Sequence, residues 1–473
     1  MTDPAAFTAA ELIHRYGSRA LSPVEVAEAV LARIDRFNPQ VNAFVYLDAE
    51  AVRDMARAAE ARWARGEPAG LLDGVPVTVK DNLWAAGWPA RRGSLTSDHT
   101  PAPEDAPAVA ALRRHGAVIL GKTTMPEYGW KGLGDSPLTG VTRNPWALDR
   151  TTGGSSAGAA AAAALNMGML HIGTDGAGSI RIPCGFTGVF GLKPSMGRVP
   201  AYPASPFWPV AHIGPMTRTV TDAALMLSVL AEPDLRDSMA WNTAAPDCRI
   251  GLEDGVRGLR VALSPRLGTS TRNDADIEKS VAEAAQAFAD LGAHVEEADP
   301  ELPDTLGPLL ALWSAGTAVL LDSIPEERHA MMDPGLVRMG EQGRRISGAD
   351  FLRAMNARAE IALRMTRFHE RYDLLLTPSL PIPAIEAGRD VPASGEWGDH
   401  WINWTPYSYP FNLSWQPAAS CPCGLTGDGL PIGLQIVGPP RRDDLMLRAA
   451  RAFEKARPFR VIDAPRDTSG ARA

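Results

Sequence analysis

Two glycine-rich turns of this chain carry serines whose surroundings suit nucleophilic chemistry. Ser179 directly follows the small-residue run 173–178, and Ser155 lies 24 residues upstream in a second turn, 152–158. A serine hydroxyl becomes an effective nucleophile only when a base removes its proton. Backbone N–H groups of a small-residue turn can point freely and stabilise a developing oxyanion. The Ser179 turn can therefore supply both a nucleophile and an oxyanion hole.

The candidate base is Lys80, which ends the apolar segment 75–79. An ordinary lysine, with a pKa of about 10.4, is protonated at neutral pH and cannot accept a proton. Burial disfavours the charged form and can lower this pKa by several units. Taken alone, Lys80 could equally be a surface lysine. In the same way, the Ser155 turn could serve only to cap a helix over 157–165.

These three segments resemble the amidase signature family, serine hydrolases that cleave amides with a Ser–cisSer–Lys triad. Further motifs in the family's order lie at 22–25, 121–127, 191–194 and 429–435. By matching position, the resemblance implies that Ser179 is the nucleophile. It implies that Ser155 is the bridging serine, preceded by a cis peptide bond, and that Lys80 is the base.

The resemblance also implies an oxyanion hole made by the N–H groups of Gly176, Ala177, Gly178 and Ser179. Ala177 stands where the family commonly has glycine, as Ala157 does in the turn of the paired serines. Alanine keeps its N–H group but disfavours a positive φ.

Three neighbours are expected to support these turns. Ser156 is expected to contribute hydrogen bonds beside Ser155. Arg181, two residues after the nucleophile, is expected to anchor the turn by binding carbonyl groups or Asp175. Binding of an acidic substrate is the alternative role for Arg181.

Aromatic residues supply candidates for the wall of a substrate pocket. The segment 391–415 is rich in aromatic residues, glycine and proline and is expected to loop over a pocket. Each aromatic side chain can instead pack in the core. The pattern favours a hydrophobic or aryl amide, although esters and carbamates (urethanes) share the same electrophilic carbon. The candidates are Tyr128, Trp130, Phe207, Trp208, Trp401, Trp404 and Trp415.

The order of elements predicts an α/β fold. Strands that alternate with helices favour a largely parallel sheet, whereas the family resemblance implies a large mixed central sheet with helices on both faces. We expect a helical N-terminal segment, 1–66, packed on a catalytic domain, 67–465. The region 231–375 is expected to be its most variable part, and 466–473 a flexible tail.

Composition restricts the classes of partner. The 473 residues carry a net charge of −8 and contain no long basic run, which argues against nucleic acid and anionic membranes. The start of the chain lacks a signal-peptide pattern, and the longest apolar stretch, 159–170, is short for a membrane span. We expect a cytoplasmic enzyme that acts on a small amide-type molecule; a homodimer is an open alternative to a monomer.

Neither cysteine nor histidine spacing predicts a metal site. The four cysteines contain no C-x-x-C pair, and the nine histidines form no H-E-x-x-H motif. We therefore expect no metal and no cofactor, and we expect reduced, buried cysteines.

Three other interpretations remain open. Residues 116–123 fit the Walker A pattern of nucleotide-binding proteins, although their interior is apolar and strand-like. Residues 154–158 fit the G-x-S-x-G nucleophile elbow centred on Ser156, but a polar loop precedes them. The elbow also needs a histidine, and His212, His329, His369 and His400 lie in no diagnostic context. The amidase signature family also provides the glutaminase-type component of tRNA-linked amidotransferase complexes.

Overall fold

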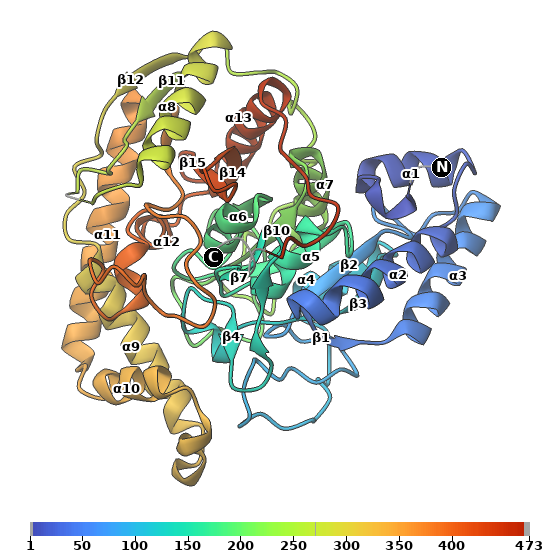
Figure 1. The fold of residues 1–473 in the computed structure, drawn as a ribbon, viewed down its shortest axis with the longest axis horizontal. Helices are drawn as coiled ribbons and strands as arrows, with labels where there is room; N and C mark the ends of the chain where they lie inside the picture. Colours follow the sequence, from blue (N-terminus) through green and yellow to red (C-terminus); the bar gives the residue numbers. More distant parts are fainter. Residues whose placement is uncertain (1–2, 270, 468–473) are drawn as a thin grey trace.

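One sheet of eleven strands forms the centre of the computed structural model, which describes residues 3–269 and 271–467 (Figure 1). The strand order is β1-β3-β2-β8-β10-β9-β14-β15-β13-β11-β12. The strands are β1 (Phe44–Leu47), β2 (Pro76–Lys80), β3 (Val118–Thr123), β8 (Leu170–Asp175), β9 (Phe190–Lys193), β10 (His212–Thr217), β11 (Arg260–Leu263), β12 (His294–Glu297), β13 (Leu374–Pro378), β14 (Ala418–Leu425) and β15 (Pro431–Val437).

The sheet is mixed, which confirms the fold implied by the family resemblance. Strand β2 runs parallel to β3 and β8, and β11 runs parallel to β12 and β13. The other pairs are antiparallel. The expectation of a largely parallel sheet is wrong, in part because β14 and β15 are joined by a short turn that forces them to run antiparallel.

Two groups of helices cover the sheet, so its central strands are buried along their length. Helices α5 (Ala157–Ala164) and α6 (Arg181–Thr187) pack on each other and on strands β8, β9, β14 and β15. A second group, in contact from one helix to the next, consists of α4 (Pro107–Arg114), α7 (Val220–Leu230), α13 (Asp443–Ala456) and α8 (Ala275–Asp290).

The N-terminal segment is helical, as expected, but it also contributes to the sheet. Helix α2 (Pro23–Val41) is capped at its start by a capping box of Ser22 and Glu25, and α3 (Ala49–Arg65) is capped by Asp48. Together with α1 (Ala9–Gly17), these helices form one end of the molecule (Figure 1). Strand β1, between α2 and α3, pairs with β3 and ties this segment to the sheet.

Three helices between β12 and β13 form a separate layer. Helices α10 (Pro334–Gly343) and α11 (Gly348–Arg371) both pack on α9 (Leu306–Asp322) beside the sheet, along the left side of Figure 1. Their apolar faces join the aromatic segment 401–413 in a second hydrophobic core.

Short elements complete the chain. They are the 3-10 helices η1 (Pro4–Ala6), η2 (Glu127–Gly129), η3 (Glu326–Met331) and η4 (Trp401–Trp404), helix α12 (Pro410–Leu413), and two small sheets made of β4 (Asp135–Ser136) with β5 (Gly140–Val141) and of β6 (Arg143–Asn144) with β7 (Ala147–Thr151). Most of the predicted tail, 468–473, lies outside the described residues. Within the described ranges, no helix has the length and apolar character needed to cross a membrane.

Candidate active site

The three predicted site residues come from neighbouring parts of the fold. Strands β2 and β8 are parallel neighbours, so Lys80 at the end of β2 and Asp175 at the end of β8 lie at the same edge of the sheet. Helix α5 begins two residues after Ser155, and α6 begins two residues after Ser179. The sheet edge and the two helix starts therefore meet at one point.

Lys80 is fully buried among hydroxyl groups. Its Nζ atom lies 2.7 Å from Ser155 Oγ, 3.0 Å from Ser156 Oγ and 2.9 Å from Thr174 Oγ1. Burial lowers the pKa of Lys80 well below its ordinary value, although the negative charge of Asp175 opposes this shift. A neutral amine has two N–H donors and one lone pair, so one of these hydroxyls can donate its proton to Lys80.

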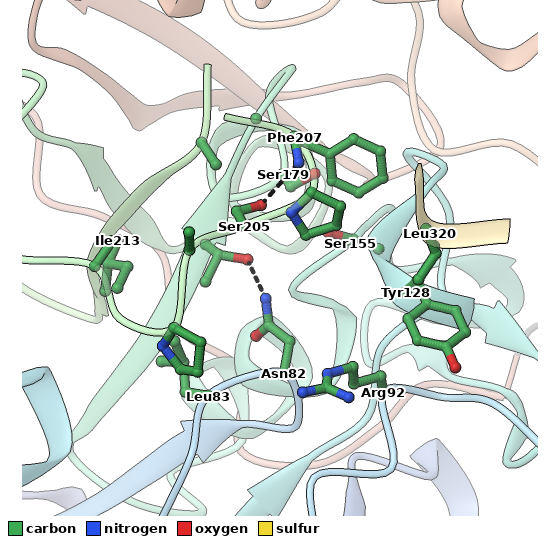
Figure 2. Close-up of a pocket in the computed structure, with 18 of the residues that line it drawn as sticks. Asn82, Leu83, Arg92, Tyr128, Ser155, Ser179, Ser205, Phe207, Ile213 and Leu320 are labelled. Atoms are coloured by element: carbon green, nitrogen blue, oxygen red, sulfur yellow. Dashed lines mark hydrogen bonds between the residues drawn. The ribbon is translucent and has the colours of Figure 1, made fainter. Parts of the chain in front are cut away.

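Ser155 and Ser179 both face one cavity (Figure 2). The peptide bond between Gly154 and Ser155 is cis. The Ser156 N–H group donates to the Ser179 carbonyl at 3.1 Å, which joins the two turns. In the described part of the chain, no hydrogen bond links the two hydroxyls of Ser155 and Ser179. Lys80 is therefore in contact with Ser155, and Ser179 lines the same cavity as Ser155.

The Ser179 turn is organised by the carboxylate of Asp175. This carboxylate accepts the N–H group of Gly178 at 2.7 Å and that of Ile180 at 3.1 Å. The N–H group of Gly178 is therefore already bound by Asp175, so in this structure it is not available as an oxyanion donor. Among the residues that the structure describes, the N–H groups of Gly176, Ala177 and Ser179 have no partner.

The positive φ in this turn falls on Gly178, at 118°, and not on Ala177. An alanine at position 177 is therefore compatible with the turn. Ala157 is the first residue of α5, where alanine is equally suitable.

Arg181 is buried and anchors the turn. Its Nε atom lies 3.0 Å from the Asp175 carboxylate, and the guanidinium also donates to the Ser408 carbonyl and to Gln435 and Asn412. Burial alone would raise the pKa of Asp175, but attraction to Arg181 and the hydrogen bonds from Arg181 and Asn412 hold it below its ordinary value. Arg181 does not line the cavity, so the structure gives it the anchoring arrangement and not contact with a substrate.

Sequence reasoning missed several contacts of the site. Thr174 and Asn82 share a 3.2 Å hydrogen bond. Thr174 lies in the Ser179 turn and Asn82 lies two residues after Lys80, so closeness in the chain was a usable signal. Asn412 and Gln435 hold Arg181 from more than 200 residues away, and no spacing pattern links them to it.

The cavity has a volume of about 420 Å³ and a mainly apolar wall. Of the seven predicted aromatic residues, Tyr128 and Phe207 line it. It is also lined by residues that the sequence did not single out, several of them from α9: Leu83, Arg92, Tyr202, Ile213, Trp313, Val319, Leu320 and Ser323. Trp313 stacks on Phe207 with the ring centroids 3.9 Å apart.

The other five aromatic predictions need correction. Trp130, Trp401 and Trp404 are buried in the second hydrophobic core, where a large ring contributes most to packing. Trp415 donates its ring N–H to the Pro209 carbonyl and lies under the guanidinium of Arg358. Trp208 is 46% exposed at the surface.

The structure does not support the two motif-based alternatives. Residues 118–123 form the interior strand β3, and Lys122 Nζ is buried and donates to the Leu83 carbonyl at 2.6 Å. This segment is not a phosphate-binding loop. The hydroxyl of Ser156 bonds to Lys80 and Thr174 and to no histidine within the described ranges, so it lacks the partner that a nucleophile elbow needs.

Comparison with known proteins places this geometry in a family. The sequence model of the family described as "Amidase" matches residues 25–447. The chain belongs to the amidase signature family. An acylamidase of Rhodococcus erythropolis is 38% identical over 459 residues, which cover 96% of each chain. The glutamyl-tRNA(Gln) amidotransferase of Symbiobacterium thermophilum has an A subunit that is 36% identical, over 95% of this chain and 96% of its own.

Solved structures of amidase signature enzymes share the fold. A bacterial aryl acylamidase of this family superposes with a TM-score of 0.89 at 32% identity, over 96% of both chains. A 6-aminohexanoate cyclic dimer hydrolase, solved with its substrate, superposes with a TM-score of 0.88 at 29% identity, over 97% of this chain and 98% of its own. This amidase signature protein is an amide-hydrolysing enzyme.

Proposed function

We propose that this enzyme hydrolyses hydrophobic or aryl amides through an acyl-enzyme on Ser179, with Ser155 as proton relay and Lys80 as base. The proposal depends most on one observation: a fully buried lysine amine lies 2.7 Å from the Ser155 hydroxyl in the cavity that Ser179 also lines. No surface lysine would be available as a neutral base at physiological pH.

In the proposed first step, Ser179 Oγ attacks the amide carbonyl carbon. Its proton passes to Ser155 Oγ, whose own proton passes to the neutral amine of Lys80. The proton then returns along the same route to the leaving nitrogen, and the C–N bond breaks. Water attacks the resulting ester by the same sequence and releases the acid.

The oxyanion formed in each step is assigned to the free N–H groups of Gly176, Ala177 and Ser179. Each such donor typically contributes about 3 kcal/mol to the stability of the transition state. Gly178 acts differently, because its bond to Asp175 holds the turn in shape. Arg181 supports the same turn through Asp175.

The apolar character of the cavity supports a hydrophobic substrate. Phe207, Trp313 and Leu320 give it an aromatic and aliphatic wall, which suits an aryl or acyl group. The relatives named as acylamidase and aryl acylamidase point in the same direction. Esters and carbamates present the same reacting carbon and remain within the proposed range.

A second candidate function is that of the glutaminase-type component of an amidotransferase complex. It is favoured by the 36% identity to the glutamyl-tRNA(Gln) amidotransferase chain over nearly the whole sequence. The described cavity wall argues against glutamine as the preferred substrate, because its one acidic side chain, Asp175, is already bound by Arg181 and leaves the ammonium group of glutamine without a counter-charge.

A substrate panel tests the proposal. Anilides, aliphatic amides, aryl esters, carbamates and free glutamine are compared by kcat/KM, with Ser179→Ala as the control. We expect anilides to exceed acetamide by at least about tenfold, since a filled apolar pocket adds binding energy. Equal turnover of acetamide and an anilide would remove the hydrophobic preference. Activity on glutamine alone would favour the second candidate, and an active Ser179→Ala variant would exclude Ser179 as nucleophile.

The dependence of the rate on pH tests the role of Lys80. The base must be neutral, and burial lowers the pKa of Lys80 well below 10.5. We therefore expect kcat/KM for a neutral amide to rise with pH on the acid side and to level off well before an ordinary lysine loses its proton. A rate that keeps rising to about pH 10 would assign an unshifted pKa to the base.

A further inference from the structure

The cavity wall contains one cation without a partner, Arg92. Its guanidinium forms neither an ion pair nor a hydrogen bond with any residue in 3–269 or 271–467, yet Arg92 lines the cavity that contains Ser179. Figure 2 shows Arg92 near Tyr128 and Asn82 at one edge of the cavity, with Phe207 at another. The adjacent Arg91 differs, since its guanidinium lies 3.1 Å from a ring nitrogen of His99 and it does not line the cavity.

The backbone holds Arg92 in an unfavourable conformation. Its φ is +52°, and that of Tyr128 is +51°, a region that non-glycine residues rarely adopt. The Tyr128 N–H group donates to the Arg92 carbonyl at 2.7 Å, so these two residues are bonded to each other, and both line the cavity. Such backbone strain persists where the surrounding structure enforces it, often at ligand-binding positions.

The same loop is tied to the candidate base. Asp81, which directly follows Lys80, accepts the N–H groups of Arg91 and Gly93 at 3.3 and 3.4 Å. At Gly93, a Cβ atom would lie 2.5 Å from the Met125 carbonyl oxygen, so the loop packs closely on the chain beside it. The backbone of Arg92 is therefore fixed relative to Lys80.

No acidic side chain in the described wall of the cavity competes for Arg92. Asp175 is the one acidic residue that this wall contains. Its carboxylate is already bound by Arg181, Asn412 and the N–H group of Gly178. An arginine fork is always charged and matches the geometry of a carboxylate.

We propose that Arg92 binds a carboxylate carried by the substrate, so that acidic amides are preferred over neutral amides of the same shape. This inference rests on the proposed amide hydrolysis at Ser179. It narrows the substrate class to amides that combine an apolar group, held against Phe207 and Trp313, with a carboxylate that reaches Arg92. The ion pair between Arg92 and the carboxylate would also distinguish acidic from neutral amides that carry the same apolar group, which the apolar wall alone cannot do.

Two matched pairs of anilides test the proposal. Succinanilic acid and butyranilide differ by a carboxylate on the acyl side, and 4-acetamidobenzoate and acetanilide differ by one on the amine side. We expect the wild-type kcat/KM of at least one acidic member to exceed that of its neutral partner by about tenfold. Arg92→Gln should remove this ratio, Arg92→Lys should keep part of it, and the control Arg91→Gln should leave it unchanged.

A binding measurement separates this proposal from the proposed function. In the Ser179→Ala background, calorimetry should give tighter binding of the acidic member, and adding Arg92→Gln should abolish the difference. If the acidic member binds more tightly in this way but the wild-type enzyme hydrolyses none of the anilides, the carboxylate site is supported and the proposed hydrolysis is overturned. Equal binding and equal kcat/KM within both pairs, or a preference that survives Arg92→Gln in a folded variant, would overturn the role of Arg92.

Discussion

Lys80→Met is expected to lower kcat for amide hydrolysis by about 10⁴-fold, the scale seen when a general base is removed. Methionine keeps the length and apolar stem of lysine but cannot accept the proton of Ser155. The free N–H groups of the Ser179 turn remain, so a small residual rate should persist. Steady-state kinetics on an anilide, together with the pH profile, measure the effect. The acid limb of that profile should disappear with the amine.

A second buried lysine provides the control. Lys193 is also fully buried and donates to the carbonyl groups of Pro194 and Gln416, but it does not contact the candidate serines. Lys193→Met should change stability more than kcat. If both variants lose kcat to the same degree, the loss reflects damage to the core and not removal of the base.

Arg181→Met should destabilise the protein by about 3–5 kcal/mol, because it leaves the buried carboxylate of Asp175 without its ionic partner. The wild-type pair has its Nε and carboxylate oxygen 3.0 Å apart, and both side chains are almost completely buried. The free energy of unfolding is measured by urea denaturation, with kcat recorded at a temperature where the variant is folded. Replacing both residues, as Arg181→Met with Asp175→Asn, should recover part of the loss, since no charge then remains unpaired.

An exposed ion pair of similar length is the matched control. Arg344 and Asp322 lie 2.7 Å apart, but their side chains are 48% and 60% exposed. Water and salt screen such a pair, so Arg344→Met should change stability far less. Equal losses for the two variants would mean that burial does not set the strength of the Arg181 pair.

The candidate chemistry could be located from the sequence because it depends on local turns. Lys80, Ser155 and Ser179 each lie within a short motif. The structure brings Ser155 and Ser179 to one cavity and places the buried Lys80 in contact with Ser155. Helix starts were predictable for the same reason, since Ser22 and Asp48 cap helices through residues close to them in the chain.

Features that depend on distant segments were not predictable in this way. Strand β9 lies between β10 and β14, although Lys193 and its partner Ala418 are far apart in the chain. Trp130, Trp401 and Trp404 were wrongly predicted for the cavity wall because a tryptophan is buried equally well in a core as in a pocket. The true wall includes Trp313 and Leu320 of α9, and an apolar helix pattern does not reveal which of its residues face a cavity.

The participation of α9 in the cavity wall bears on how the enzyme can be redesigned. The groups assigned to the chemistry belong to the sheet edge and the two serine turns, whereas Val319, Leu320 and Ser323 come from a helix and its end, inserted between β12 and β13. Libraries that randomise these three positions can therefore reshape substrate choice without touching the reactive centre. Trp313 should be kept, because its ring packs directly against Gly176 of the Ser179 turn. A Cβ atom on Gly176 would lie only 2.8 Å from that ring.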